Sequence, residues 1–367
     1  MKKYGFNEIT LMQYILIIHG IQVGIGVLTM PRDLAEKAGT DGWISILIGW
    51  GIAVAASLTI VNVMKRHPDG TLLDLVTNRF GKIAGKAMTI VMALYLILGF
   101  TTTIATAISI TRVWILSQTP PSVILILFFI PGYIIARSGV RILGRYSELV
   151  FFLAAGSPFV LLATLPNAHW LHMLPVLKEG WLRVFVTARS TVLSFLGFEL
   201  SFFLYPFLNR KERAGVGIVI ANTLSMLVFV FVTVVCNLFF SPDEITEYTW
   251  PTLSLLKVIE FRFLERFDIV FLAFYLFIFS TTWLPLLLFA AFCTSQLTGR
   301  EDHSLHLAFT IVVAIAVSWF YFPQFTHLVA MQNLWSIVGI IVAYGLPVLL
   351  WVIFGLFRRS GPGGETA

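Results

Sequence analysis

Long stretches without a charged residue alternate with short polar segments along the whole chain. A helix needs about 20 apolar residues to cross the hydrocarbon core of a bilayer. Single spans are predicted at 9–31, 43–63, 87–111, 113–136, 149–177, 181–208, 214–242 and 269–299, and two more, joined near 324–333, at 303–357. The pattern therefore predicts an all-α integral membrane protein with ten transmembrane helices.

Composition agrees with this pattern. Of the 367 residues, 58% are hydrophobic and 12% are charged, whereas soluble domains average about 45–50% apolar and about 25% charged residues. The net charge of +6 could suggest a nucleic-acid partner, but the basic residues are spread over many loops. No compact basic patch is visible, so the bilayer is the expected partner and nucleic acid is not.

The distribution of Lys and Arg orients the predicted helices. With a cytoplasmic N-terminus, 16 of the 25 basic residues fall on the cytoplasmic side, as the positive-inside rule requires. Both termini are then expected in the cytoplasm. We expect one transmembrane domain over residues 1–367, with five-helix repeats at 1–165 and 181–357 and a short cytoplasmic tail at 358–367.

Two of the predicted helices are interrupted at matching places. The first contains Gly24-Ile-Gly26, and the sixth contains Gly197 and Glu199 in an apolar segment. Helices one and six are equivalent if ten helices form two inverted five-helix halves. Paired breaks of this kind indicate a transporter-type binding site, because they free backbone groups at mid-membrane. The alternative is close helix packing, since Gly20 and Gly24 also have small-xxx-small spacing.

These residues carry a family resemblance. The run 24–31, Gly-Ile-Gly-Val-Leu-Thr-Met-Pro, resembles the first-helix signature of the amino acid/polyamine/organocation permease superfamily, and 195–199, Phe-Leu-Gly-Phe-Glu, is similar to its broken sixth helix. The ten-helix length and the run 204–208, Leu-Tyr-Pro-Phe-Leu, which leads into Lys211, resemble the B subunit of spore germinant receptors, the GerB-type spore germination permease family.

The resemblance implies a LeuT-like 5+5 inverted repeat in the inner membrane of the spore. It also implies A and C subunits as partners and a central pocket for a small germinant, commonly an amino acid. The expected function is that of a membrane subunit that binds the germinant and triggers germination. The alternative is a proton- or sodium-coupled amino acid transporter acting alone.

The ligand's two charged ends are expected at the two breaks. An amino-acid carboxylate fits the N–H groups of Gly24, Ile25, Gly26 and Val27, where the second half-helix begins. The ammonium group is expected at the carbonyl groups of Leu196, Gly197 and Phe198.

Glu199 is the single acid placed deep in a predicted span. Such groups are costly in lipid and usually face a cavity. Glu199 is therefore a candidate proton carrier or partner for the ligand's ammonium group. Capping of the second half-helix is the alternative.

Two further helices supply candidate pocket walls. Tyr95, Gly99 and Thr102 share one face of the third helix, with bundle packing as the alternative. In the eighth helix, Thr281 and Thr282 are candidate ligand contacts, and Ser280 with Thr281 forms a candidate sodium site. Ser and Thr also join helices in membranes. The chain shows no catalytic motif, so the sequence predicts neither an enzyme nor a cofactor.

Overall fold

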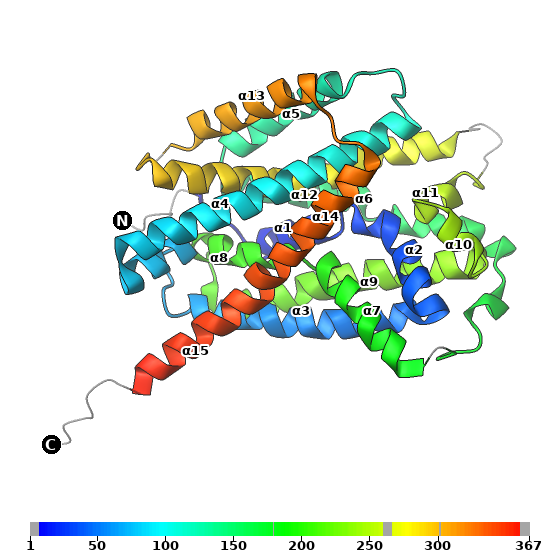
Figure 1. Cartoon of the computed structure of the whole chain (residues 1–367), viewed down its shortest axis with the longest axis horizontal. Helices are drawn as coiled ribbons and strands as arrows, with labels where there is room; N and C mark the ends of the chain where they lie inside the picture. The colour runs from blue at the N-terminus through cyan, green and yellow to red at the C-terminus, as the bar shows by residue number, and fades with distance from the viewer. Residues whose placement is uncertain (1–6, 179, 260–265, 301, 360–367) are drawn as a thin grey trace.

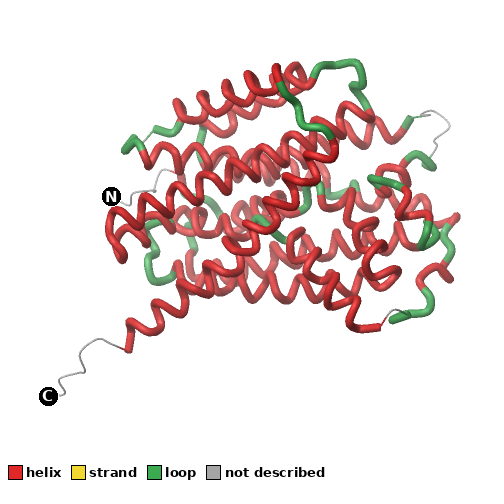
Figure 2. Tube along the Cα trace, viewed as in Figure 1, coloured by secondary structure: helices red, strands yellow, loops and turns green. Residues whose placement is uncertain are grey.

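Helices make up nearly all of the computed structural model, which describes residues 7–178, 180–259, 266–300 and 302–359 (Figures 1 and 2). The longer helices are α1 (Leu11–Gln22), α2 (Gly26–Ala38), α3 (Gly42–Met64), α4 (Leu72–Trp114), α5 (Pro121–Arg137), α6 (Val140–Ala154), α7 (Gly180–Ser194), α9 (Ala214–Phe239), α12 (Phe267–Leu297), α13 (Ser304–Phe320), α14 (Phe325–Gly339) and α15 (Leu346–Arg359). The short helical turns are η2 (Gly39–Asp41), η3 (Pro158–Asn167), η4 (Trp170–Met173), η5 (Phe198–Leu200), α8 (Ser201–Leu204), η6 (Tyr205–Phe207), η7 (Lys211–Arg213), α10 (Glu244–Glu247), α11 (Pro251–Leu256) and the π-helical η8 (Ile340–Gly345).

The helices group into ten candidate spans over the described residues. Six helical segments are long and apolar enough to cross a membrane, and α7 with residues 198–207 makes a seventh, bent by 46°. The shorter apolar helices α1, α5 and α13 bring the number to ten. Helix α1 continues into α2 across a break, so these two helices count together as the first span and α3 as the second. The all-α membrane architecture predicted from the charge-free runs is confirmed. The predicted tail at 358–367 lies outside the described residues from position 360 onward.

Several span boundaries differ from the prediction because charged residues and polar amides enter helices. The fifth span begins at Val140, and its first turns carry Arg141, Arg145 and Glu148. The predicted join at 324–333 lies largely inside α14, which begins at Phe325. A helix can start with charged turns when long side chains reach the headgroup region.

Local sequence fixes the start of the first span. Thr10 caps α1 by a capping box: its hydroxyl accepts from the Gln13 N–H at 3.1 Å, and the Gln13 side chain accepts from the Thr10 N–H at 3.0 Å. Ile9 then pairs with the end of the sixth span, since its N–H donates to the Phe207 carbonyl at 2.9 Å. The start of the first span is thus tied to the end of the sixth span.

The first span lies inside the bundle. Helix α1 packs against α6, α9 and α12, while α2 packs against α7, α9, α10 and α11. The small helices α10 and α11 lie at the end of the bundle opposite the end of α15 (Figure 1). The two halves of the first span share α9 but otherwise have different neighbours, which places the break at a junction of several helices.

Candidate functional site

The break in the first span is held by hydroxyl groups of α12. Helix α1 ends at Gln22 and α2 begins at Gly26. The Tyr275 hydroxyl donates to the Gly24 carbonyl at 2.8 Å, which satisfies one of the carbonyls that the break removes from the helix. The hydroxyls of Thr281 and Thr282 both donate to the Gly20 carbonyl, at 3.3 and 3.2 Å.

Glycine at positions 20 and 24 also allows α12 to approach closely. A Cβ added to Gly24 would lie 2.1 Å from Thr282 Oγ1, and one added to Gly20 would lie 2.9 Å from the Thr281 Cβ. Gly20 and Gly24 therefore allow close helix packing, which is the alternative that their small-xxx-small spacing suggested. Gly26 differs, because its added Cβ would meet nothing closer than the Phe229 ring at 3.6 Å.

The break in the sixth span requires glycine for its backbone conformation. Gly197 has φ +125°, a region that residues with a Cβ rarely adopt. An added Cβ would also lie 2.6 Å from Cγ2 of Ile21 in α1. The two breaks therefore lie side by side, with the backbone of one against the side chains of the other.

Gln22 joins the two breaks. Its side-chain amide donates to the Phe195 carbonyl at 2.8 Å and to Asn222 Oδ1 at 2.9 Å. Its oxygen accepts from the Ser225 hydroxyl at 2.6 Å, and Ser225 also pairs with His19 Nδ1 at 3.0 Å. Both N–H groups and the oxygen of this buried amide are hydrogen-bonded, so the network fixes α1, α9 and the sixth-span break relative to one another.

Glu199 is completely buried and doubly hydrogen-bonded. The Tyr95 hydroxyl donates to its Oε1 at 2.5 Å, and the Gly197 N–H donates to its Oε2 at 2.6 Å. The second bond matches the capping alternative. The bond from Tyr95 joins two residues that were both predicted from the sequence to line the pocket, but not to bond to each other.

The remaining predicted wall is tightly packed. Trp335 of α14 covers Gly99, where an added Cβ would lie 2.7 Å from the indole nitrogen. Phe198 packs edge-on against Tyr344 with ring centroids 5.2 Å apart. Thr102 donates back to the Leu98 carbonyl at 2.7 Å within its own helix.

Leu196 completes this wall. It lies against Gly339, whose added Cβ would be 2.5 Å from the Leu196 Cδ1. The residues expected from the third and sixth spans therefore gather at one wall, which α14 and η8 close.

Ser280 lies apart from the break. Its hydroxyl pairs with the Tyr146 hydroxyl at 2.6 Å and donates to the Phe277 carbonyl. The hydroxyls that meet at the Gly20 carbonyl are those of Thr281 and Thr282. The structure thus groups Thr281 with Thr282, whereas the sodium site expected from the sequence was Ser280 with Thr281.

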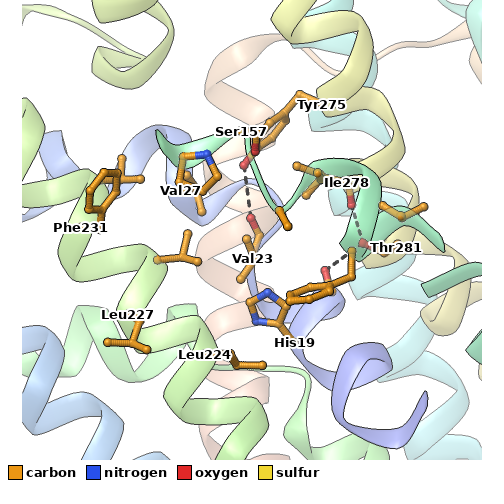
Figure 3. Close-up of a pocket in the computed structure, with 18 of the residues that line it drawn as sticks. His19, Val23, Val27, Ser157, Leu224, Leu227, Phe231, Tyr275, Ile278 and Thr281 are labelled. Carbon is orange, nitrogen blue, oxygen red and sulfur yellow. Dashed lines mark hydrogen bonds between the residues drawn. The ribbon is translucent and has the colours of Figure 1, made fainter. Parts of the chain in front are cut away.

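A cavity of about 470 Å³ lies beside the first-span break, where Val23 and Val27 line it (Figure 3). It is enclosed by α1, α2, the α6–η3 junction, α9 and α12, and most of its lining is apolar. Of the predicted ligand residues, Val27 and Thr281 line it. Tyr95 and Glu199 are not among the residues that line it, so the cavity and the Tyr95–Glu199 pair are separate features of the structure.

Several residues at the breaks were missed from the sequence. Gln22, Asn222 and Ser225 are polar residues inside apolar helices, and such residues mark function or helix contacts in membranes. Their signal was present but weaker than that of glycine or acid. Tyr275 and Trp335 gave no signal, because aromatic residues are frequent throughout this chain.

Comparison with known proteins places this geometry in a family. The family model described as "Spore germination protein" matches residues 8–326. This chain belongs to the spore germination permease family. Among its relatives, the spore germination protein GerQB of Bacillus cereus is 27% identical over 259 residues, covering 71% of each chain. Spore germination protein A2 of Bacillus subtilis is 26% identical over 362 residues and 95% of each chain.

The fold of this spore germination permease is LeuT-like. The crystal structure of MhsT in complex with L-phenylalanine superposes with a TM-score of 0.66 at 14% identity, covering 96% of this chain and 89% of that chain. The family resemblance and the fold predicted from the sequence are thus confirmed. The protein is an integral membrane protein of a transporter fold, and its relatives are germination proteins rather than enzymes.

Proposed function

We propose that this protein is the B-type membrane subunit of a spore germinant receptor, and that it binds a small germinant, an amino acid, where the two broken spans meet. The observation that carries the proposal is the contact of the breaks, with the Gln22 amide bonded to the Phe195 carbonyl. Packing alone does not require two interrupted spans to meet. Irregular backbone at membrane depth normally serves a binding or transport site.

The chemistry of the breaks suits an amino acid. The first N–H groups of α2, at Gly26 and Val27, have no partners within their helix and carry the positive end of its dipole, which favours a carboxylate. The ammonium group is assigned to the carbonyls of 196–198, with Glu199 close by. MhsT, which has a similar fold, was crystallised with L-phenylalanine.

Ligand entry at this wall requires α14 to move. Trp335 lies over Gly99, and the side chains of Tyr95 and Phe198 are fully buried. Binding therefore selects a conformation in which the indole leaves Gly99. Such coupled movement provides a means by which a bound germinant signals to partner subunits.

The family relationship supports an assembly with A and C subunits in the inner membrane of the spore. We assign both termini to the cytoplasm from the distribution of Lys and Arg. We divide the chain into repeats at 1–165 and 181–357, with the broken spans at equivalent places.

A subunit exchange tests the proposed function. Spores that carry this subunit in place of the B subunit of a receptor with a known germinant are challenged with amino acids, sugars and nucleosides. The proposal expects germinant preference to follow this subunit and to include an amino acid. Preference that stays with the host receptor's A and C subunits contradicts it.

A sodium-coupled transporter acting alone is the second candidate. It is favoured by the hydroxyl oxygens of Thr281 and Thr282, which lie 3.3 and 3.2 Å from the Gly20 carbonyl oxygen. Neutral oxygen ligands of this kind suit a hard cation. Saturable, sodium-dependent amino-acid uptake by the purified chain in proteoliposomes supports this candidate, and its absence beside a working receptor excludes it.

A further inference from the structure

The cavity beside the first-span break has an uncharged lining. No Asp, Glu, Lys or Arg is among the described residues that form it, and most of its side chains are aliphatic or phenylalanine. A zwitterionic amino acid carries two full charges, which are costly to bury without partners. The cavity therefore suits a different class of molecule from the germinant proposed above.

Most hydroxyl groups in the lining are already committed. The hydroxyl hydrogens of Ser147, Thr252, Tyr275 and Thr281 all donate to backbone carbonyls, at 2.7 to 3.0 Å in their shortest contacts. The Thr252 and Tyr275 hydroxyls join neighbouring helices to the first-span break, whereas those of Ser147 and Thr281 make their shortest bonds within their own helices. These four hydroxyls leave little capacity to donate a hydrogen bond to a ligand.

Two polar lining residues are exceptions. The Ser157 hydroxyl has no hydrogen-bond partner among the described residues. His19 is 7% exposed, and its Nδ1 pairs with the Ser225 hydroxyl. Its other ring nitrogen, Nε2, has no hydrogen-bond partner among the described residues, although the ring lines the cavity (Figure 3). An imidazole nitrogen that borders a cavity and has no protein partner is available to hydrogen-bond a ligand.

The surrounding network determines what Nε2 can do. The Gln22 amide nitrogen must face the Phe195 carbonyl, so its oxygen must accept, and the Ser225 hydroxyl supplies the proton. The Ser225 oxygen is then left to accept from His19 Nδ1–H. In the neutral imidazole, Nε2 consequently carries a lone pair and is an acceptor.

An entrance to the cavity lies at the membrane-facing surface between η3 and α9. Leu227 and Phe159 both line the cavity, and they are 55% and 61% exposed. The Phe159 and Phe231 rings meet at this edge, with centroids 5.8 Å apart. An apolar molecule dissolved in the bilayer can therefore reach the cavity without crossing water.

We propose that this cavity binds an uncharged, largely apolar small molecule, such as an alcohol or phenol, that enters from the bilayer and donates one hydrogen bond to Nε2 of His19. The volume of about 470 Å³ is in the range of about 300–1,000 Å³ found for small-molecule sites. The occupant contacts Val23 and Val27 on either side of the helix break. Its binding therefore biases any movement of α1 relative to α2.

Photolabelling of the purified chain in lipid nanodiscs tests this site. The probes are a diazirine-bearing octanol and the matching diazirine-bearing octane, which differ only in the hydroxyl group. We expect the octanol probe to label α1 and α9 about three- to ten-fold more than the octane probe, the effect of one neutral hydrogen bond. Unlabelled octanol is expected to compete for this labelling.

The variants separate the hydrogen bond from the entrance. His19→Phe keeps a ring and should abolish the preference for octanol. Leu227→Trp should narrow the entrance and lower labelling by both probes, whereas Leu94→Trp, at a 63% exposed position on α4 outside the cavity lining, should leave it unchanged.

Three results overturn the proposal. The first is equal labelling by the two probes in the wild-type chain. The second is an octanol preference that persists in His19→Phe. The third, which stays decisive if His19→Phe does not fold, is labelling that is indifferent to Leu227→Trp or spread evenly over the lipid-facing surface.

Discussion

Adding one methyl group at each of two neighbouring glycines should have opposite effects on stability. In Gly24→Ala the new Cβ lies 2.1 Å from Thr282 Oγ1, whereas in Gly26→Ala it lies 3.6 Å from the Phe229 ring. Ordinary contacts begin at 3.4 Å, so in the first case the Thr282 hydroxyl must rotate away from the Gly20 carbonyl or α12 must withdraw. Overpacking of a buried contact costs about 1–3 kcal/mol.

Gly26→Ala should instead be neutral or stabilising. It reduces the freedom of the unfolded chain by about 0.4–1 kcal/mol without a clash. The two variants should therefore differ in free energy of unfolding by about 1.5–4 kcal/mol. The measurement is the unfolding midpoint of each purified variant in the same detergent.

Thr282→Ala in the Gly24→Ala background provides the internal test. It removes the hydroxyl that the new Cβ meets, leaving the Thr282 Cβ at 3.0 Å. The double variant should recover part of the lost stability, with a coupling energy of about 0.5–3 kcal/mol. Equal stability of Gly24→Ala and Gly26→Ala, or no recovery in the double variant, refutes the reasoning.

Three other substitutions probe the contacts between the breaks. Gln22→Leu should lower the unfolding midpoint strongly, because each buried polar group left unpaired costs about 1–3 kcal/mol. Tyr95→Phe removes the donor to Glu199 Oε1 and should destabilise the chain by about 1–3 kcal/mol, while also altering the germinant dose response. Gly197→Ala combines a strained φ of +125° with a clash and should prevent accumulation or lower the midpoint by several degrees.

Matched controls isolate these effects. Each control should change the unfolding midpoint little. Gln296→Leu, at an exposed site, is the control for Gln22→Leu, and Tyr133→Phe, without a hydrogen bond in the described structure, is the control for Tyr95→Phe. Gly51→Ala, with open space around it, is the control for Gly197→Ala. If a control shifts the midpoint as much as its partner, the effect is generic to that residue type. The assigned contact is then not its cause.

The sequence predicted the fold well because charge-free runs and broken helices depend on local composition. Helix breaks at 23–25 and near Gly197 follow from glycine, and both appear where expected. Boundaries were less accurate, as in α6, where Arg141 and Arg145 lie inside the helix. Charges near a membrane surface do not end a helix, so counting them cannot locate its ends.

The candidate site was predicted in part. The glycines and Glu199 gave a signal because each is unusual in an apolar helix. The covering of Gly99 by Trp335 was not predictable, since it joins residues more than 200 positions apart. The cavity at His19 likewise depends on how the α6–η3 junction packs against α9, which no local pattern specifies.

The most direct test of the central claim is the germination dose response of spores carrying Gly26→Leu, with Gly51→Leu as the control at equal protein levels. Gly26 has room for a Cβ, so the larger side chain should fill the proposed site without the clash expected at Gly24. The account predicts that Gly26→Leu loses the germinant response while Gly51→Leu keeps it. A normal dose response from Gly26→Leu spores contradicts a germinant site at the breaks.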